Sequence, residues 1–194
     1  MAKPKVASDW LAGCAGCHMS LLDIDERIAK LVELVDLRAT PITDLKEPDE
    51  SGVTVGILEG GINNSYNEEV AKKMRARCQI LVALGDCAVF GGVPAMRNFF
   101  TIEDSLKRAY IETPSTDGSG KIPSSPELAV PTRVRALHEV VKVDVFIPGC
   151  PPDADIIFFA LAELAQGRIP KLEDKNLMWR SEERRVGKEC RSRW

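Results

Sequence analysis

The chain has 194 residues, of which 44% are hydrophobic and 28% are charged, and its formal net charge at pH 7 is -3. This length suits one domain with a sizeable core, and the composition is ordinary for a globular protein. The small acidic excess does not indicate the basic surface that nucleic-acid binding requires, so we expect no nucleic-acid partner. Since no run of about 18 apolar residues is present, the sequence predicts no membrane span.

The amino-terminal sequence does not have the pattern of an export signal. Asp9 interrupts the short apolar run that follows Lys3 and Lys5, and no twin arginine precedes that run. We therefore expect a cytoplasmic protein, in which thiols stay reduced. In that compartment cysteines serve metal binding or catalysis more often than disulfides.

The first half of the chain predicts a strand, a long helix and two further strands. Apolar and β-branched residues predict strands at Lys5–Leu11 and at Val35–Thr40. Between them, His18–Val35 carries most of its apolar residues on one helical stripe, which predicts a single helix. The run VTVGIL predicts a third strand at Val53–Leu58, after a loop of turn-forming residues.

The second half predicts helices alternating with two more strands. Tyr66–Arg77 is a charged, amphipathic helix, and Gln79–Leu84 is apolar nearly throughout, as is typical of a strand buried on both faces. Val143–Ile147 predicts the last strand. A final helix follows, capped at its start by Asp153 and ended at Gly167.

This alternation predicts an α/β fold, specifically a flavodoxin-like doubly wound parallel sheet with right-handed crossovers. Pro94–Glu139 does not follow the alternation, because it is rich in Pro, Ser, Thr and Gly. We interpret it as a surface loop excursion, directed toward a partner, within one domain that spans residues 1–179.

The last fifteen residues, 180–194, differ from the rest in charge and periodicity. Their sequence, RSEERRVGKECRSRW, is identified as a widely used sequencing adapter read in one frame. We therefore expect an assembly artefact that replaces the native carboxyl terminus, and we leave it out of the fold prediction. The alternative is a genuine basic tail for an anionic partner.

Four cysteines follow the ends of the predicted strands. Cys14 and Cys17 come after the first strand, Cys87 after Gln79–Leu84, and Cys150 after the last strand. Because the carboxyl ends of parallel strands share one edge of a sheet, these distant thiols are expected to meet there. Converging thiolates predict a metal site. Cys78 lies in the charged-helix segment, away from any strand end, and is expected to be a structural thiol.

Several chemistries compete for these cysteines. Cys14-Ala-Gly-Cys17-His18 matches the c-type haem attachment pattern and also suits a thioredoxin-like redox pair, but both leave Cys87 and Cys150 unused. Four thiolates also make a structural zinc site, although zinc ribbons pair two short knuckles. A single 4Fe-4S cluster uses all four cysteines, one on each iron, and is the favoured interpretation.

Residues beside the thiols are candidates for contact with the metal site or a partner. Four glycines allow close backbone approach and amide hydrogen bonds to cluster sulfur, and they are Gly13, Gly16, Gly85 and Gly149. Pro151 stiffens the turn after the last thiol. Glu59 ends an apolar strand, where a carboxylate is costly unless it is paired or functional. His18 is either a contact of the site or a polar helix end.

The stretch from Gly60 to Ser65 precedes the second predicted helix. Its amides are candidates for binding a phosphate, such as that of FMN, but a simple turn is the favoured interpretation. For Glu59 we expect a role in proton relay or partner contact.

Four segments together closely resemble the small subunit of cytoplasmic bidirectional nickel-iron hydrogenases of the NAD-reducing type. They are GCAGCHMSLLDIDER, ILEGGI, ALGDCAVFGGVPAMRN and FIPGCPPDAD, and the resemblance spans Trp10 to Gly167. It implies that the four cysteines ligate one proximal 4Fe-4S cluster. It also implies a partner large subunit with the catalytic Ni-Fe centre, diaphorase subunits with flavin, Fe-S clusters and NAD, and FMN as a candidate cofactor.

The resemblance implies an electron-transfer subunit with no catalytic residue of its own. Exported hydrogenases carry a twin-arginine signal and a carboxyl-terminal cysteine-rich domain, both of which this sequence lacks, so one cluster per chain is expected. Related alternatives are the Fe-S subunit of a respiratory quinone oxidoreductase, which has adjacent cysteines in place of Cys14-Ala-Gly-Cys17, and a ferredoxin- or deazaflavin-linked hydrogenase subunit. A zinc-stabilised interaction module and a thiol-disulfide oxidoreductase represent other functional classes.

Overall fold

A sheet of five parallel strands is the centre of the computed structural model, which describes residues 3–42, 44, 48, 50–116 and 119–172. The predicted adapter tail at 180–194 lies outside these residues. The strands are β1 (Lys5–Trp10), β2 (Asp36–Ala39), β3 (Val53–Glu59), β5 (Cys78–Leu84) and β7 (Val145–Ile147). Their order is β2-β1-β3-β5-β7, with every neighbouring pair parallel. This is the flavodoxin-like strand order, so the predicted fold class is confirmed.

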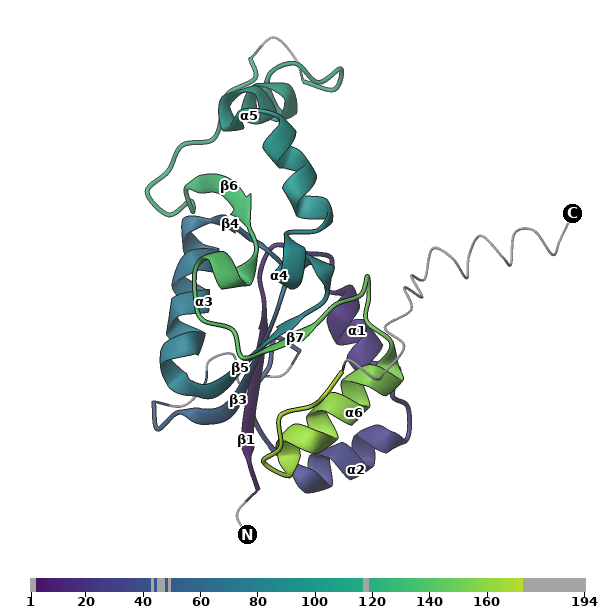
Figure 1. The fold of residues 1–194 in the computed structure, drawn as a ribbon. Coiled ribbons are helices and arrows are strands. Elements are labelled where there is room, and N and C mark those ends of the chain that lie inside the picture. Colours follow the sequence, from purple (N-terminus) through teal and green to yellow (C-terminus); the bar gives the residue numbers. More distant parts are fainter. Residues whose placement is uncertain (1–2, 43, 45–47, 49, 117–118, 173–194) are drawn as a thin grey trace, which may run out of the picture.

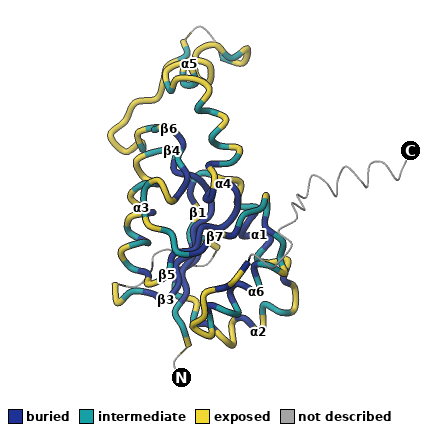
Figure 2. The backbone as a smooth tube through the Cα atoms, viewed as in Figure 1, coloured by how far each residue is buried: buried dark blue, intermediate teal, exposed yellow. Residues whose placement is uncertain are grey.

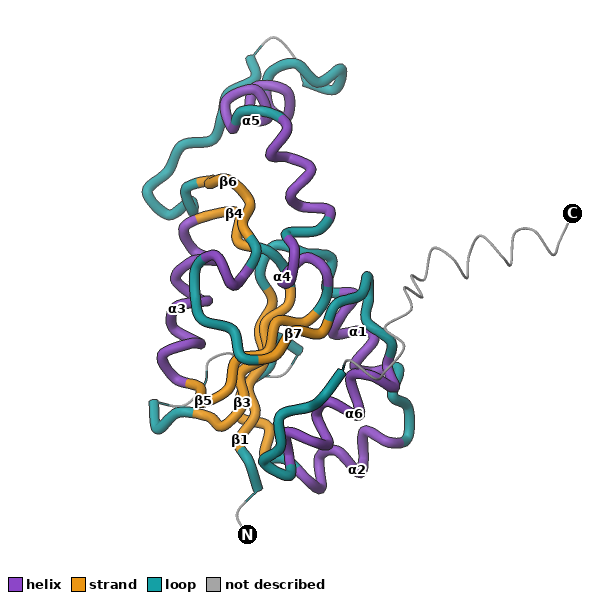
Figure 3. The backbone as a smooth tube through the Cα atoms, in the orientation of Figure 1, coloured by secondary structure: helices purple, strands orange, loops and turns teal. Residues whose placement is uncertain are grey.

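Helices cover both faces of this sheet (Figures 1 and 3). The helices α1 (Gly16–Leu22), α2 (Arg27–Leu34) and α6 (Ala154–Ala165) lie on one face, and α3 (Ser65–Arg77) and α4 (Asp86–Phe90) lie on the other. Asp153 caps α6 as predicted, because its side chain accepts a hydrogen bond from the amide of Asp155. Among the described residues, no helix is both long and apolar enough to cross a membrane.

The alternation of side chains along the strands divides the core into two layers. Val82 and Leu84 of β5 pack with α6, in a cluster that also includes Ile157. The intervening Leu81 and Ala83 point to the other face and pack with α3. Both faces of the sheet are therefore apolar, which is why the central strands are dark blue, or buried, in Figure 2.

The single helix predicted at His18–Val35 is wrong, because the structure has two shorter helices there. The chain breaks between α1 and α2 at Asp25, whose φ is 55°. Aspartate tolerates this left-handed conformation better than most residues do. The break lets the neighbouring Ile24 reach the core, where it is 0% exposed.

The excursion predicted at Pro94–Glu139 is only partly a loop. It contains most of the 3-10 helix η1 (Val93–Phe99), helix α5 (Ile102–Tyr110), strand β6 (Pro131–Arg135) and the 3-10 helix η2 (Leu137–Glu139). Strand β6 pairs in antiparallel fashion with β4 (Ile62–Asn64), which forms a second, two-stranded sheet. The stretch from Gly60 to Ser65, predicted to be a turn, therefore contains a short strand that is stabilised by a partner distant in sequence.

Candidate metal centre

The structure brings the four predicted cysteines to the carboxyl-end edge of the sheet. Cys14 follows β1, Cys17 lies in the first turn of α1, Cys87 lies in α4 directly after β5, and Cys150 follows β7. Each of Cys14, Cys87 and Cys150 acts electrostatically on Cys17, so all four thiols share one site. Cys17 is buried, whereas Cys14 and Cys150 are exposed, and the site therefore has an inner and an outer side.

Hydrogen bonds fasten the loops that carry Cys87 and Cys150 to each other. The amide of Asp86 donates to the carbonyl of Gly149 at 2.9 Å, and the amide of Gly149 donates to Asp86 Oδ1 at 2.7 Å. Ser20 of α1 donates to the carbonyl of Pro152 at 2.5 Å, which connects the helix that carries Cys17 to the loop that carries Cys150. The side chains of Asp86 and Ser20 are both buried. Sequence reasoning missed these two residues, although a polar residue between Gly85 and Cys87 was a usable signal.

The loop that carries Cys14 and Cys17 is anchored on the segment after β3. The amide of Leu11 donates to the carbonyl of Glu59 at 2.8 Å, and Ala12 and Gly61 exchange two backbone hydrogen bonds at 2.8 and 2.9 Å. Between these bonds lies Gly60, with φ of 89°. A Cβ at Gly60 would lie 2.9 Å from the Ala12 backbone, so only glycine permits this approach.

Two of the four predicted glycines give the thiols their space, and a third lets the turn after Cys150 close. A Cβ at Gly85 would overlap with Cys17 Sγ, and one at Gly16 would lie 3.1 Å from Cys14 Sγ. At Gly149 it would lie 2.5 Å from Pro152 Cα. Gly13 is the exception, because its nearest contact, Gly60 Cα at 3.4 Å, is an ordinary one. Pro151 follows Cys150 through a cis peptide bond.

The glycine next to Cys17 yields the first prediction. Gly85→Ala is expected to abolish metal loading, since the new methyl group overlaps the Cys17 sulfur and the site cannot widen without moving β5. Iron content after anaerobic purification with the partner subunits checks this. Gly167→Ala is the matched control, because Gly167 also has a positive φ, 75°, but no atom lies within 4 Å of its Cβ position. That variant should lose about 1–2 kcal/mol of stability and keep its iron. Full iron content in Gly85→Ala would contradict the assignment.

Electrostatics at this edge disfavours a free thiolate. Burial, followed by the charge of Glu59 and the other thiols, raises the pKa of Cys17 far above its ordinary value. Burial and the neighbouring thiols raise the pKa of Cys87 to about 11. A thiol-disulfide oxidoreductase needs the opposite shift, toward a reactive thiolate at neutral pH. A bound metal supplies the positive charge that these thiolates lack.

Four thiols are the donor set that a 4Fe-4S cluster uses. Within the described part of the chain, no three His, Cys, Asp or Glu side chains lie close enough to hold one metal ion. A tetrahedral zinc ion requires four thiolates at about 2.3 Å from a single point. A 4Fe-4S cluster instead places each thiolate on a different iron and so spreads them apart. The glycine contacts around Cys14 and Cys17 leave room at the thiols themselves.

His18 and Glu59 form a buried pair next to Cys17. His18 is 2% exposed, so the interpretation of this residue as a polar helix end is wrong. Glu59 Oε2 accepts a hydrogen bond from the His18 amide at 2.7 Å and lies 2.5 Å from His18 Nδ1. The other ring nitrogen lies 3.0 Å from Ser8 Oγ. The buried carboxylate is therefore paired, as its cost of burial requires.

Three amides between Gly61 and Asn67 are already used within the fold. Gly61 and Ser65 donate to the carbonyls of Ala12 and Val130, and the amide of Asn67 donates to Asn64 Oδ1 at the start of α3. These bonds occupy donors that a phosphate would need. This segment therefore does not have the arrangement expected of a phosphate site.

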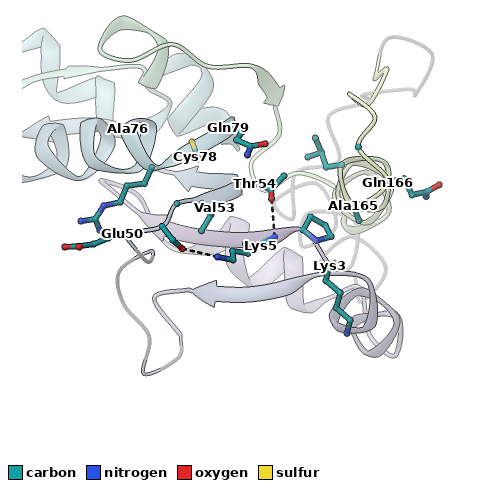
Figure 4. Close-up of a pocket in the computed structure, with 16 residues that line it drawn as sticks. Lys3, Lys5, Glu50, Val53, Thr54, Ala76, Cys78, Gln79, Ala165 and Gln166 are labelled. Atoms are coloured by element: carbon teal, nitrogen blue, oxygen red, sulfur yellow. Dashed lines mark hydrogen bonds between the residues drawn. The ribbon is translucent and has the colours of Figure 1, made fainter. Parts of the chain in front are cut away.

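Cys78 lies at the opposite edge of the sheet. It is the first residue of β5, not a helical residue as predicted, and seven residues of strand place it roughly 23 Å from Gly85. It lines a hollow of about 820 Å³ together with Lys5 and Arg77 (Figure 4). Lys5 donates to Ser51 Oγ at 3.0 Å and Arg77 to the carbonyl of Pro48 at 2.8 Å, so these basic groups serve the fold.

The chain is similar to a subunit family of NADH ubiquinone oxidoreductase and to subunits of hydrogenases. The family model for the 20 Kd subunit of NADH ubiquinone oxidoreductase matches residues 14–164. The chain is 45% identical over 169 residues to the NAD-reducing hydrogenase HoxS subunit delta of Cupriavidus necator, covering 86% of this chain and 80% of that protein. It is 32% identical to the sulfhydrogenase 2 subunit delta of Pyrococcus furiosus, covering 84% of this chain but 63% of that one.

One solved structure is similar in both sequence and fold. The crystal structure of an NAD+-reducing NiFe-hydrogenase in the H2-reduced state matches with a TM-score of 0.84 at 39% identity. The match covers 88% of this chain and 95% of that one. The likeness therefore extends over most of both chains.

Proposed function

The chain belongs to the family of the 20 Kd subunit of NADH ubiquinone oxidoreductase, in which it is a small subunit of the NAD-reducing nickel-iron hydrogenase type, and we propose that it relays electrons through one 4Fe-4S cluster. Cys14, Cys17, Cys87 and Cys150 would hold the cluster. When bound, a 4Fe-4S cluster supplies one-electron transfer. The convergence of four thiols at one sheet edge carries this proposal.

The relay has two ends, both outside this chain. A Ni-Fe centre in a large subunit would supply H2 oxidation, which releases two protons and two electrons. A diaphorase module would use two electrons and one proton to reduce NAD+ to NADH. The similarity to NAD-reducing hydrogenases supports this coupling of H2 to NAD. The chain's own residues hold the relay site in place and present one side of it to a partner.

The surface next to Cys87 is suited to a large subunit. Between residues 90 and 100, five apolar side chains are at least 61% exposed, and we call them the apolar platform: Phe90, Val93, Met96, Phe99 and Phe100. Monomeric proteins rarely expose so many large apolar groups together. A Cβ at Gly92, within this stretch, would lie 3.0 Å from Cys87 Sγ, so a subunit that covers the platform would also lie next to Cys87.

Hydrogen bonds hold the platform rigid before any partner binds. Asn98 exchanges two hydrogen bonds with the backbone of Val134 in β6, both at 2.8 Å. Arg97 donates to the carbonyls of Asn63 and Thr132, on the two strands of the small sheet. The second sheet therefore supports η1, and a preorganised surface of this kind loses little entropy on binding.

The test is the metal content of the complex of this chain with its large subunit, purified anaerobically without residues 180–194. About four irons and four sulfides beyond the Ni-Fe centre, with a reduced-state EPR signal that appears under H2, are expected. Zinc without sulfide would instead support an interaction module. A metal-free site with a redox-active Cys14 and Cys17 would support a thiol oxidoreductase.

A further inference from the structure

Both ends of the loop that carries Cys14 and Cys17 form hydrogen bonds with one neighbouring segment, residues 59–61. Before Cys14, Ala12 exchanges backbone hydrogen bonds with Gly61 at 2.8 and 2.9 Å. After Cys17, the amide of His18 donates a hydrogen bond to the side chain of Glu59 at 2.7 Å. Gly60 lies between Glu59 and Gly61, and its backbone packs closely against Ala12. This contact fixes the position of the segment relative to the loop.

Glu59 is the only ionisable residue of this segment, and it is 2% exposed. One oxygen, Oε2, lies within hydrogen-bond distance of both the His18 amide and His18 Nδ1. The other, Oε1, lies 3.8 Å from the position where a Cβ would stand on Gly13, in the same loop. The carboxylate thus lies against the Cys14–Cys17 loop, close enough for its charge to act on Cys17.

We propose that Glu59 is a positioning residue of the relay site. Its carboxylate fixes the Cys17 end of the loop through His18, and its negative charge lowers the reduction potential of the bound cluster. The first role follows from the two hydrogen bonds to the residue next to Cys17. The second follows because adding an electron to a cluster is less favourable next to a buried negative charge, where screening is weak. This inference rests on the proposed 4Fe-4S cluster.

Two substitutions separate these roles. Glu59→Gln keeps a carbonyl oxygen, whose two lone pairs can accept both hydrogen bonds from His18, but removes the charge. Glu59→Ala removes the charge and both bonds. A merely structural role predicts no change of potential in Glu59→Gln, whereas our proposal predicts a shift to a more positive value.

The measurement is an EPR-monitored redox titration of the complex with the large subunit, together with its iron and sulfide content. Glu59→Gln should keep the iron and sulfide of the unsubstituted complex and titrate at a more positive potential. Glu59→Ala should lose iron faster to an external chelator. Asp144→Asn is the control. Asp144 is another largely buried carboxylate, paired with Arg75, and its backbone neighbour Leu81 is roughly 13 Å along β5 from Gly85.

The control should change neither the potential nor the iron content. An unchanged potential in Glu59→Gln with a full cluster would overturn the charge role. Chelator resistance equal to that of the unsubstituted complex in Glu59→Ala would overturn the positioning role. If the unsubstituted complex itself held no iron and sulfide at this site, the proposed function would fail, and this outcome is separate from both others.

Discussion

Cys87→Ser is expected to remove the iron and sulfide of this subunit and to abolish H2-dependent NAD reduction. Cys87 is the first thiol after β5, and the site offers no spare cysteine among the described residues, because Cys78 lies at the far edge of the sheet. Iron and sulfide analysis of the complex measures the first effect. The reduced-state EPR spectrum measures whether any cluster remains.

Cys78→Ser provides the matched control for this loss. It makes the same chemical change in the same strand-helix unit, in a residue that is more deeply buried than the half-buried Cys87, so it tests whether loss of a thiol alone disturbs the fold. Iron, sulfide and activity should stay at the level of the unsubstituted complex. Equal loss of iron from the two variants would remove the basis for assigning Cys87 as a ligand.

Phe99→Ala is expected to weaken binding to the large subunit by about 30- to 1000-fold, or roughly 2–4 kcal/mol, as for a central anchor of the platform. Phe99 is 84% exposed in the free chain, so its truncation removes little from the fold. The dissociation constant is obtained from a dilution series of the complex by analytical ultracentrifugation. The free energy of unfolding of the free chain, measured by thermal denaturation, should change by less than about 0.5 kcal/mol.

Leu34→Ala is the control for the platform. Leu34 is also an exposed apolar residue, 43% exposed, but it lies on α2, at the other end of the molecule from α5 (Figure 1). Its substitution should leave the dissociation constant unchanged. If Leu34→Ala weakened the complex and Phe99→Ala did not, the large subunit would bind on the helical face of α2 instead.

The features that follow from local patterns could be predicted from the sequence. The runs that end before Cys14, Cys87 and Cys150 are strands, and a parallel sheet necessarily brings their carboxyl ends together. The convergence of thiols therefore required no knowledge of tertiary contacts. Glu59 was also recognisable from a local pattern, because a carboxylate at the end of an apolar strand needs a partner.

The features that depend on distant contacts could not be predicted. The break at Asp25 was missed because Ile24 and Ile28 continue the apolar period on both sides of it. Strand β4 has three residues and no alternating pattern, and it exists because β6 pairs with it from about 70 residues away. The partner of Glu59 is His18, 41 residues earlier, and no local pattern links the two.

The tie between Asp86 and Gly149 has a consequence for biosynthesis. Cys150 follows β7, the last strand of the sheet, so a nascent chain that has been translated only to α4 has three of the four thiols and lacks the strand that holds the fourth. About 60 more residues must be synthesised before β7 can dock on β5, which takes several seconds at ordinary translation rates of about 5–20 residues per second. Insertion of the metal centre is thus expected only after the chain has been translated beyond Cys150.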